Sequence, residues 1–231
     1  ISWMDEDRFA CVQDEQGRIF VYNVVDKKIE QEIPFADDGD FEDIAIAGDV
    51  AYVLRADGEI FVINNFRSEK PRVSQYGLAL PGVDLEGLAF DGSARRLLIA
   101  DKGKEKGGTE ERKIYAFDLT SRKIAEDPAL KVDLNDPAFN VLGEDKKEKN
   151  LRPSAIAIHP SSGEYYILEG AKRKLLILTP EGKIKSVQQL DPHDFKQPEG
   201  ISFSKNGDLF ISNEGSKKEA GNILHVNLDD L

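Results

Sequence analysis

Large apolar and small side chains alternate in four segments of the chain that begin alike. This period of two is typical of a β-strand that packs on both faces at close quarters. Residues 1–4 fit as the tail of a fifth copy. The four full segments are residues 41–46, 85–90, 153–158 and 198–203.

The same elements follow each start in the same order. A turn comes first, and its Gly or Asn tolerates the positive φ that a tight hairpin requires. Two apolar strands follow, and then a more polar fourth strand. The turns are expected at 47–49, 91–93, 160–163 and 205–208; second strands at 8–13, 50–54, 96–100, 164–168 and 209–212; third strands at 18–23, 59–63, 113–118, 174–178 and 222–227; fourth strands at 28–33, 72–78, 129–132 and 184–189.

The spacing of the repeat identifies the architecture. Glu42 and Glu86 are 44 positions apart, and Ser154 and Glu199 are 45 apart, within the range of about 40–50 residues for propeller blades. Polar inserts at 103–112 and 135–152 explain the longer gap between the second and third starts. A sandwich or a lipocalin-like barrel would not give repeated four-strand units. The sequence therefore predicts a single all-β domain over residues 1–231, a five-bladed β-propeller of four-stranded antiparallel blades.

Closure of this ring involves the two ends of the sequence. The last unit stops after its third strand, whereas the first unit begins in the middle of a strand. A propeller avoids open strand edges by letting one terminus complete the blade that the other began. We therefore expect residues upstream of Ile1 to supply the outer strand of the last blade, and an N-terminal piece to be missing here.

The repeat also predicts an acidic cluster. The first strand of each blade lines the central channel, and its first residues gather at one mouth. Converging carboxylates repel one another and must bind protons or a cation. Oxygen donors without His or Cys favour Ca²⁺ over zinc. The alternative is a solvated rim, because a register error of one position would move these side chains off the axis. The predicted metal ligands are Glu42, Glu86, Ser154 and Glu199.

A second set of polar residues follows the second strands on the same rim. Such a concave mouth could orient a small polar ligand, a protein partner or a hydrolytic water. The alternative is that these are ordinary polar residues at strand ends. The rim ligand candidates are Asp14, Glu15, Arg55, Lys102 and Asn213, and the candidate catalytic bases are Asp101, Glu169 and Glu214.

Composition excludes several classes of function. The chain has 43 acidic and 31 basic residues among 231, and its net charge of −12 disfavours binding to nucleic acid and to anionic lipid. Its single cysteine excludes an intrachain disulfide and a thiolate metal cluster. The three histidines stand at unrelated positions of the repeat, and no triad, HExxH or P-loop motif is present.

Several segments resemble the SdiA-regulated family of bacterial envelope propellers. They are residues 11–17 with 19–22, 84–88, and 197–201 with 211–215. This resemblance implies a periplasmic or extracellular protein of the cell envelope, held to the membrane only through an N-terminal membrane or lipid anchor. It implies no settled biochemical activity. Inner strands that begin with Glu-Gly and an aliphatic residue also occur in phytase-like and lactonase-like propellers.

A more distant similarity links the chain to calcium-activated nucleotidases of the apyrase type. In these five-bladed propellers, Ser and Glu from successive blades hold one axial Ca²⁺, and the order Glu42, Glu86, Ser154, Glu199 is similar to that pattern. The residues that grip the nucleotide in those enzymes have no match here.

Three hypotheses follow. The first is an envelope propeller with a Ca²⁺ ion in its channel and a rim that receives a ligand or protein, without established catalysis. The second is a calcium-dependent hydrolase of phosphate esters, phosphoanhydrides or lactones. The third is a protein-interaction scaffold without a metal.

Overall fold

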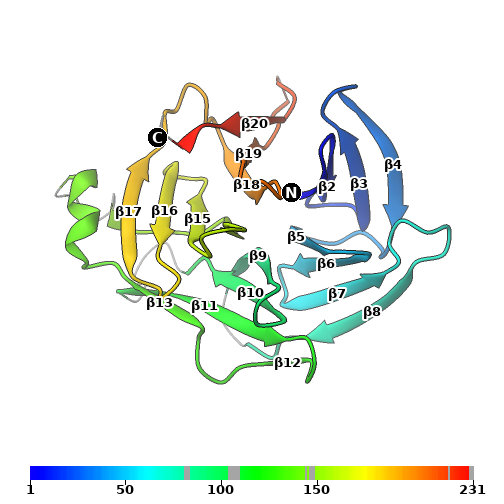
Figure 1. Ribbon diagram of the computed structural model, residues 1–231, viewed down its shortest axis with the longest axis horizontal. Coiled ribbons are helices and arrows are strands. Elements are labelled where there is room, and N and C mark those ends of the chain that lie inside the picture. The colour runs from blue at the N-terminus through cyan, green and yellow to red at the C-terminus, as the bar shows by residue number, and fades with distance from the viewer. Residues whose placement is uncertain (81–83, 104–109, 144, 146–148, 218, 229–231) are drawn as a thin grey trace.

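Five antiparallel β-sheets surround a central axis in the computed structural model, as Figure 1 shows. The structure describes residues 1–80, 84–103, 110–143, 145, 149–217 and 219–228. The first strand of each sheet lies nearest the axis, and later strands lie progressively farther out (Figure 1). The predicted all-β, five-bladed propeller is confirmed.

The first, second and fourth sheets have the four strands that the repeat predicts. Their order in the sheet follows their order in the sequence. The strands are β1 (Ser2–Asp5), β2 (Arg8–Cys11), β3 (Arg18–Asn23) and β4 (Lys28–Pro34); β5 (Phe41–Ala47), β6 (Val50–Arg55), β7 (Glu59–Asn64) and β8 (Arg72–Gly77); β14 (Ala155–Ile158), β15 (Tyr165–Glu169), β16 (Lys174–Leu178) and β17 (Ile184–Gln189).

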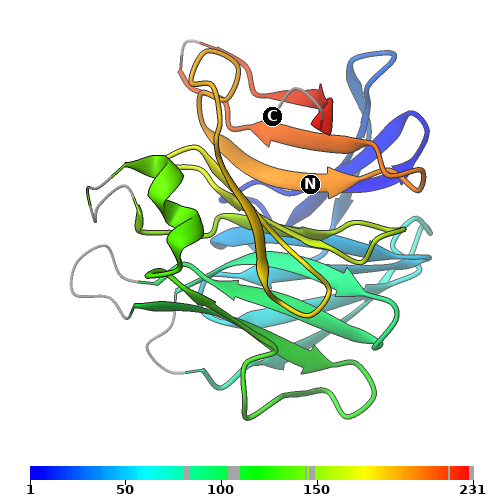
Figure 2. The same cartoon turned by 60° about the vertical axis from the view of Figure 1, so that its left-hand side comes forward.

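The third sheet departs from the plain repeat at its outer edge. It consists of β9 (Leu85–Asp91), β10 (Arg96–Asp101), β11 (Glu111–Asp118), β12 (Lys123–Ile124) and β13 (Leu130–Asp133). Both β12 and β13 pair with β11. The following insert contains a 3₁₀ helix, η1 (Pro137–Leu142), which lies at the periphery beside β17 (Figure 2). Phe139 anchors this helix, since its side chain is fully buried in the core between the third and fourth sheets.

The last sheet has three strands within the described residues: β18 (Pro198–Phe203), β19 (Leu209–Asn213) and β20 (Asn222–Val226). Completion of this sheet by residues that precede Ile1 stays a prediction. The first and last sheets nevertheless meet and close the ring. The Trp3 N–H donates to Ser202 Oγ at 2.8 Å, and the rings of Phe9 and Phe210 meet edge to face at 5.0 Å.

The hydrophobic core lies between sheets and holds the ring together. Each of four apolar clusters combines side chains from two successive sheets. The cluster between the first two sheets includes Phe41 and Phe61, whose ring centroids are 5.7 Å apart. Because alternate residues of a strand point to opposite faces, every blade can contribute to two such clusters. This packing fixes where each inner strand begins.

Candidate functional site

A one-residue bulge interrupts the start of three inner strands. In β5, Phe41 pairs with Arg55 and Asp43 pairs with Leu54, which leaves Glu42 without a partner in the ladder. The same shift occurs in β9 and in β18. The residues that these bulges leave unpaired are Glu42, Glu86 and Glu199. A bulge re-aims the side chain of its extra residue, so three blades turn a glutamate out of the regular sheet.

Ser154 occupies the corresponding place before β14. Its N–H donates to the Leu168 carbonyl at 2.8 Å. Its hydroxyl lies 3.4 Å from the Leu168 carbonyl and 3.4 Å from the Pro198 carbonyl of the next blade. Ser154 therefore stands beside the residue that precedes Glu199, although its hydroxyl is directed to backbone carbonyls.

The carboxylates of the three glutamates influence one another. Burial, and then repulsion by Glu86, raises the pKa of Glu42 to about 8 and the pKa of Glu199 to about 7. Close like charges and loss of water both favour the neutral carboxyl. The structure thus brings Glu42, Glu86 and Glu199 together at one mouth of the channel. We call this set the acidic mouth.

A glycine makes room for one of these side chains. Gly170 directly follows β15, and a Cβ atom there would lie 2.6 Å from Glu199 Oε1. Any larger residue would therefore push the carboxylate away. The small residue after the second strand of one blade thus positions the glutamate of the next.

Lys102 supplies a positive charge to the acidic mouth. Its ammonium donates a hydrogen bond to the Glu86 carboxylate. Burial raises the pKa of Glu86, and the bond to Lys102 offsets only part of that effect. Burial lowers the pKa of Lys102, but the hydrogen bond to Glu86 and the negative charges of Glu86 and Asp84 together outweigh burial, so the pKa is raised. A rim candidate from the sequence is therefore the resident counter-ion of the cluster.

Other acidic side chains surround this ion pair. Burial, followed by repulsion from Asp40, raises the pKa of Asp14. Asp14 and Asp40 in turn raise the pKa of Glu42, and Glu214 raises that of Glu199. Asp14 and Glu214, both predicted from the sequence, thus belong to the neighbourhood of the acidic mouth.

The donor chemistry of the acidic mouth suits a hard cation, since all its side-chain donors are oxygens. Among the residues that the structure describes, however, no group of three or more His, Cys, Asp or Glu is arranged to hold a metal ion. To bind there, an ion would have to displace Lys102 from Glu86 and bring the three carboxylates closer together. Their role as metal ligands stays a prediction.

Several predicted rim residues make local contacts instead. Arg55 binds Asp57 and Glu59 at 2.7 Å each. Asp101 Oδ1 accepts the Gly103 N–H at 2.9 Å. Asn213, which is buried, donates to the Asp194 carbonyl and the Asn222 side chain, whereas Glu15 is exposed and its N–H binds Gln13 Oε1. These contacts stabilise turns and strand ends.

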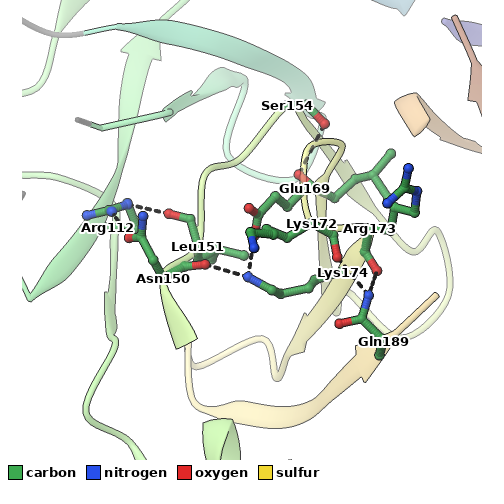
Figure 3. Close-up of polar contacts among 10 residues, drawn as sticks. Arg112, Asn150, Leu151, Ser154, Glu169, Lys172, Arg173, Lys174 and Gln189 are labelled. Atoms are coloured by element: carbon green, nitrogen blue, oxygen red, sulfur yellow. Dashed lines mark hydrogen bonds and ion pairs between the residues drawn. The ribbon is translucent and has the colours of Figure 1, made fainter. Parts of the chain in front are cut away.

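Glu169, the last residue of β15, lies in a buried polar network (Figure 3). Lys174 Nζ lies 2.9 Å from Glu169 Oε2, and their side chains are 0% and 2% exposed. Lys174 also donates to the Asn150 carbonyl. Arg112, likewise buried, donates to the Leu151 carbonyl and the Asn150 side chain (Figure 3). The network thus fixes the chain just before Ser154, and Glu169 is the ionic partner of Lys174.

Asp43 is a further buried acid, which the sequence pattern did not single out. It accepts the Ile44 N–H and, from the next blade, the Leu88 N–H, both at 2.8 Å. Burial raises the pKa of Asp43 to about 6, although these bonds oppose the rise. Asp43 therefore ties the second and third blades together directly beside the acidic mouth.

Comparison with known proteins identifies a family. The model of the family described as SdiA-regulated matches residues 1–217. No curated protein matches the chain. Within the described residues, no helix has the length and apolar character to cross a membrane.

Solved structures with the same fold include three informative examples. A protein of unknown function from Bacteroides caccae has 15% identity and a TM-score of 0.52, covering 98% of this chain and 75% of that one. Virginiamycin B lyase from Staphylococcus aureus has 16% identity and a TM-score of 0.52, covering 97% and 69%. A streptogramin B lyase has 19% identity and a TM-score of 0.50, covering 91% and 59%. At these identities the likeness shows the fold alone.

Proposed function

The chain belongs to the SdiA-regulated family, and from this premise we propose that it is a binding propeller of the bacterial cell envelope. Its acidic mouth takes up a cation, for which Ca²⁺ is the best candidate, and its rim then receives a small polar ligand or a protein. We propose no catalytic step.

The bulges at Glu42, Glu86 and Glu199 carry this proposal. Three separate blades repeat the same irregularity, and in each the extra residue is a glutamate. A bulge weakens the local ladder, and burying adjacent carboxylates opposes their ionisation. Neither feature helps the propeller fold. A cation that binds the three side chains would offset both costs.

The charge state of the acidic mouth favours exchange with a cation. At neutral pH Glu42, with its pKa of about 8, is mostly protonated, and Glu86 is held by Lys102. A divalent cation would replace a proton and an ammonium group with a single, more highly charged partner. Ca²⁺ accepts six to eight oxygen ligands in loose geometry, so carbonyls and water could complete its shell.

The place in the cell rests on the family resemblance. Members resemble envelope proteins, so we place this propeller in the periplasm or on the outer face of the envelope, with an anchor outside the sequence given. Fractionation of cells that express the full-length protein tests this placement. Recovery in the cytosolic fraction would contradict it.

Thermal unfolding with and without Ca²⁺ tests the proposed function. A ligand that binds only the folded state stabilises it by about 2.7 kcal/mol at 100 times its Kd. We therefore expect Ca²⁺ to raise the Tm and chelator to reverse the rise. The paired variant Glu86→Gln/Glu199→Gln should lose most of this response. Glu6→Gln, in the exposed turn between β1 and β2, is the matched control. An equal response in all three proteins, or no response, would refute the cation site.

A further inference from the structure

The channel has a second functional candidate at its other end. Each inner strand runs away from the acidic mouth, and Ile46 follows Glu42 by four residues, or about 13 Å of extended strand. A cavity of about 470 Å³ opens there, lined by residues of all five inner strands. Its size is in the range of small-molecule sites.

A ring of five large apolar side chains surrounds this cavity. They occupy the same position of the repeat in each blade, and each is partly exposed. The residue just before each of them is Ser or Ala, which leaves the space open. The five residues, which we call the apolar collar, are Trp3, Ile46, Phe90, Ile158 and Phe203.

Aromatic contacts hold two members of the collar in place. Phe90 stacks on Tyr52 with ring centroids 6.2 Å apart. Phe203 meets His159 at 4.9 Å and Tyr166 at 4.8 Å, both edge to face. These side chains are therefore fixed by neighbours while part of each remains open to the cavity. Such a rigid apolar wall suits a planar ligand.

The backbone of the collar is directed toward the axis. The N–H groups of His159 and Ser204 donate to the carbonyls of Glu164 and Asp208, which directly precede β15 and β19, at 2.9 Å each. In an antiparallel pair, the hydrogen-bonding direction alternates along the strand. The N–H groups of Ile158 and Phe203, one residue earlier, therefore point away from their own sheet. The same alternation applies to Phe90, because the Leu88 N–H leaves its sheet to reach Asp43.

Two of the five inward N–H groups each donate to a serine hydroxyl of the preceding blade. Ser202 Oγ accepts the Trp3 N–H at 2.8 Å, and Ser2 Oγ accepts the Ile46 N–H at 3.1 Å. At the other three junctions an alanine occupies the serine position, and its methyl group accepts no hydrogen bond. These alanines are Ala45, Ala89 and Ala157, which precede the blades of Phe90, Ile158 and Phe203 respectively.

The charged residues that line the cavity are already engaged or face solvent. Asp91 binds Ser93 Oγ at 2.6 Å and Arg96 Nε at 2.9 Å. His159 Nδ1 accepts N–H groups of its own turn, at 3.3 Å from Ser161, and Lys205 is exposed. A buried ligand charge would find no partner and would be costly.

We propose that the apolar collar binds an uncharged aromatic molecule that carries a carbonyl group. The ring of the ligand packs against the collar, and its carbonyl oxygen accepts from the N–H groups of Phe90, Ile158 or Phe203. This site is independent of the acidic mouth, which lies at the opposite end of the channel.

Two isosteric probes test this assignment. Trp3 is the only tryptophan of the chain and lines the cavity, so its fluorescence reports occupancy. We expect 2-acetylnaphthalene to bind saturably and 2-ethylnaphthalene, which lacks the carbonyl, to bind roughly threefold to tenfold more weakly, the effect of about one hydrogen bond. Equal affinities, or no saturable change with either probe, would overturn the proposal.

The serines of the other junctions suggest the matched variant. In Ala45→Ser/Ala89→Ser/Ala157→Ser, new hydroxyls can accept the three N–H groups, as Ser2 and Ser202 already do. Affinity for 2-acetylnaphthalene should fall to that of 2-ethylnaphthalene, which should itself be unchanged. Glu126→Gln, at an exposed position that does not line the cavity, should leave both affinities as they are. An unchanged preference for the acetyl probe in the folded triple variant would refute the role of the N–H groups.

A measurement on the unaltered protein avoids any folding defect of that variant. Amide resonances of Phe90, Ile158 and Phe203 should shift with 2-acetylnaphthalene and move much less with 2-ethylnaphthalene. Shifts confined to residues outside the collar would place the probe elsewhere and contradict the inference.

Discussion

Replacement of Glu42 by Gln should stabilise the metal-free propeller at high pH. Burial, then repulsion from Glu86 and Asp40, raises the pKa of Glu42 from 4.5 to about 8, while Lys102 lowers it. Between these pH values the folded state keeps a proton that the unfolded chain has lost. Stability therefore falls as pH rises through this interval. Gln has the shape of the neutral acid and does not titrate, so it removes this loss.

The size of the effect follows from the same numbers. At about 1.4 kcal/mol per pH unit, the full difference would correspond to about 5 kcal/mol. Because the side chain of Glu42 is only partly buried, solvent screening reduces this figure. We expect Glu42→Gln to exceed the parent protein by about 2 kcal/mol at pH 9 and to equal it near pH 4.

Urea denaturation in chelator, from pH 4 to pH 9, measures this difference. Glu6→Gln makes the same change of charge in an exposed turn, and its free energy of unfolding should follow that of the parent. A Glu42→Gln profile that runs parallel to the parent profile across this range would show that Glu42 is not buried among carboxylates. The placement of the acidic mouth would then be wrong.

Two further predictions concern the buried network and the absence of turnover. Lys174→Met should lower the free energy of unfolding, measured in urea, by about 3–5 kcal/mol because it leaves Glu169 buried without its ionic partner. The double variant Lys174→Met/Glu169→Leu should recover most of this loss. A Lys174→Met protein within about 1 kcal/mol of the parent would contradict the buried pair. In saturating Ca²⁺, nucleotides, phosphomonoesters and lactones should show no turnover above buffer. Turnover that disappears in Asp101→Asn or Glu214→Gln would instead support the calcium-dependent hydrolase.

The fold could be predicted because its signal is repeated. Alternation of large and small side chains, turns rich in Gly, and a spacing of 44 or 45 residues between starts agree with one another in several copies. The convergence of Glu42, Glu86 and Glu199 follows from that repeat. The bulges do not, because an extra residue becomes visible only when both strands of a pair are in register.

The partners of the charged residues could not be predicted from the sequence. Lys102 directly follows β10 like any solvated lysine, and its bond to Glu86 depends on the bulge of β9 that leaves Glu86 out of the ladder. Lys174 and Glu169 flank a turn, where charged residues are usually exposed, yet both are buried. Asn150, in the insert that precedes β14, accepts from Lys174 through its carbonyl, and the repeat predicts no such contact because the other blades lack this insert.

The apolar collar could not be distinguished from the core either, although its signal lies in the same repeat. Trp3, Phe90 and Phe203 stand where a strand packed on both faces would bury large side chains, so the alternation alone assigns them to the core. Their partial exposure arises because five inner strands meet at the axis with only Ser or Ala between them.

Anomalous diffraction from crystals grown with Ca²⁺ tests the central claim most directly. We expect a calcium peak at the acidic mouth, within coordination distance of Glu42, Glu86 and Glu199 and with Lys102 displaced from Glu86. A mouth without such a peak at saturating Ca²⁺, in which Lys102 still binds Glu86, would contradict it.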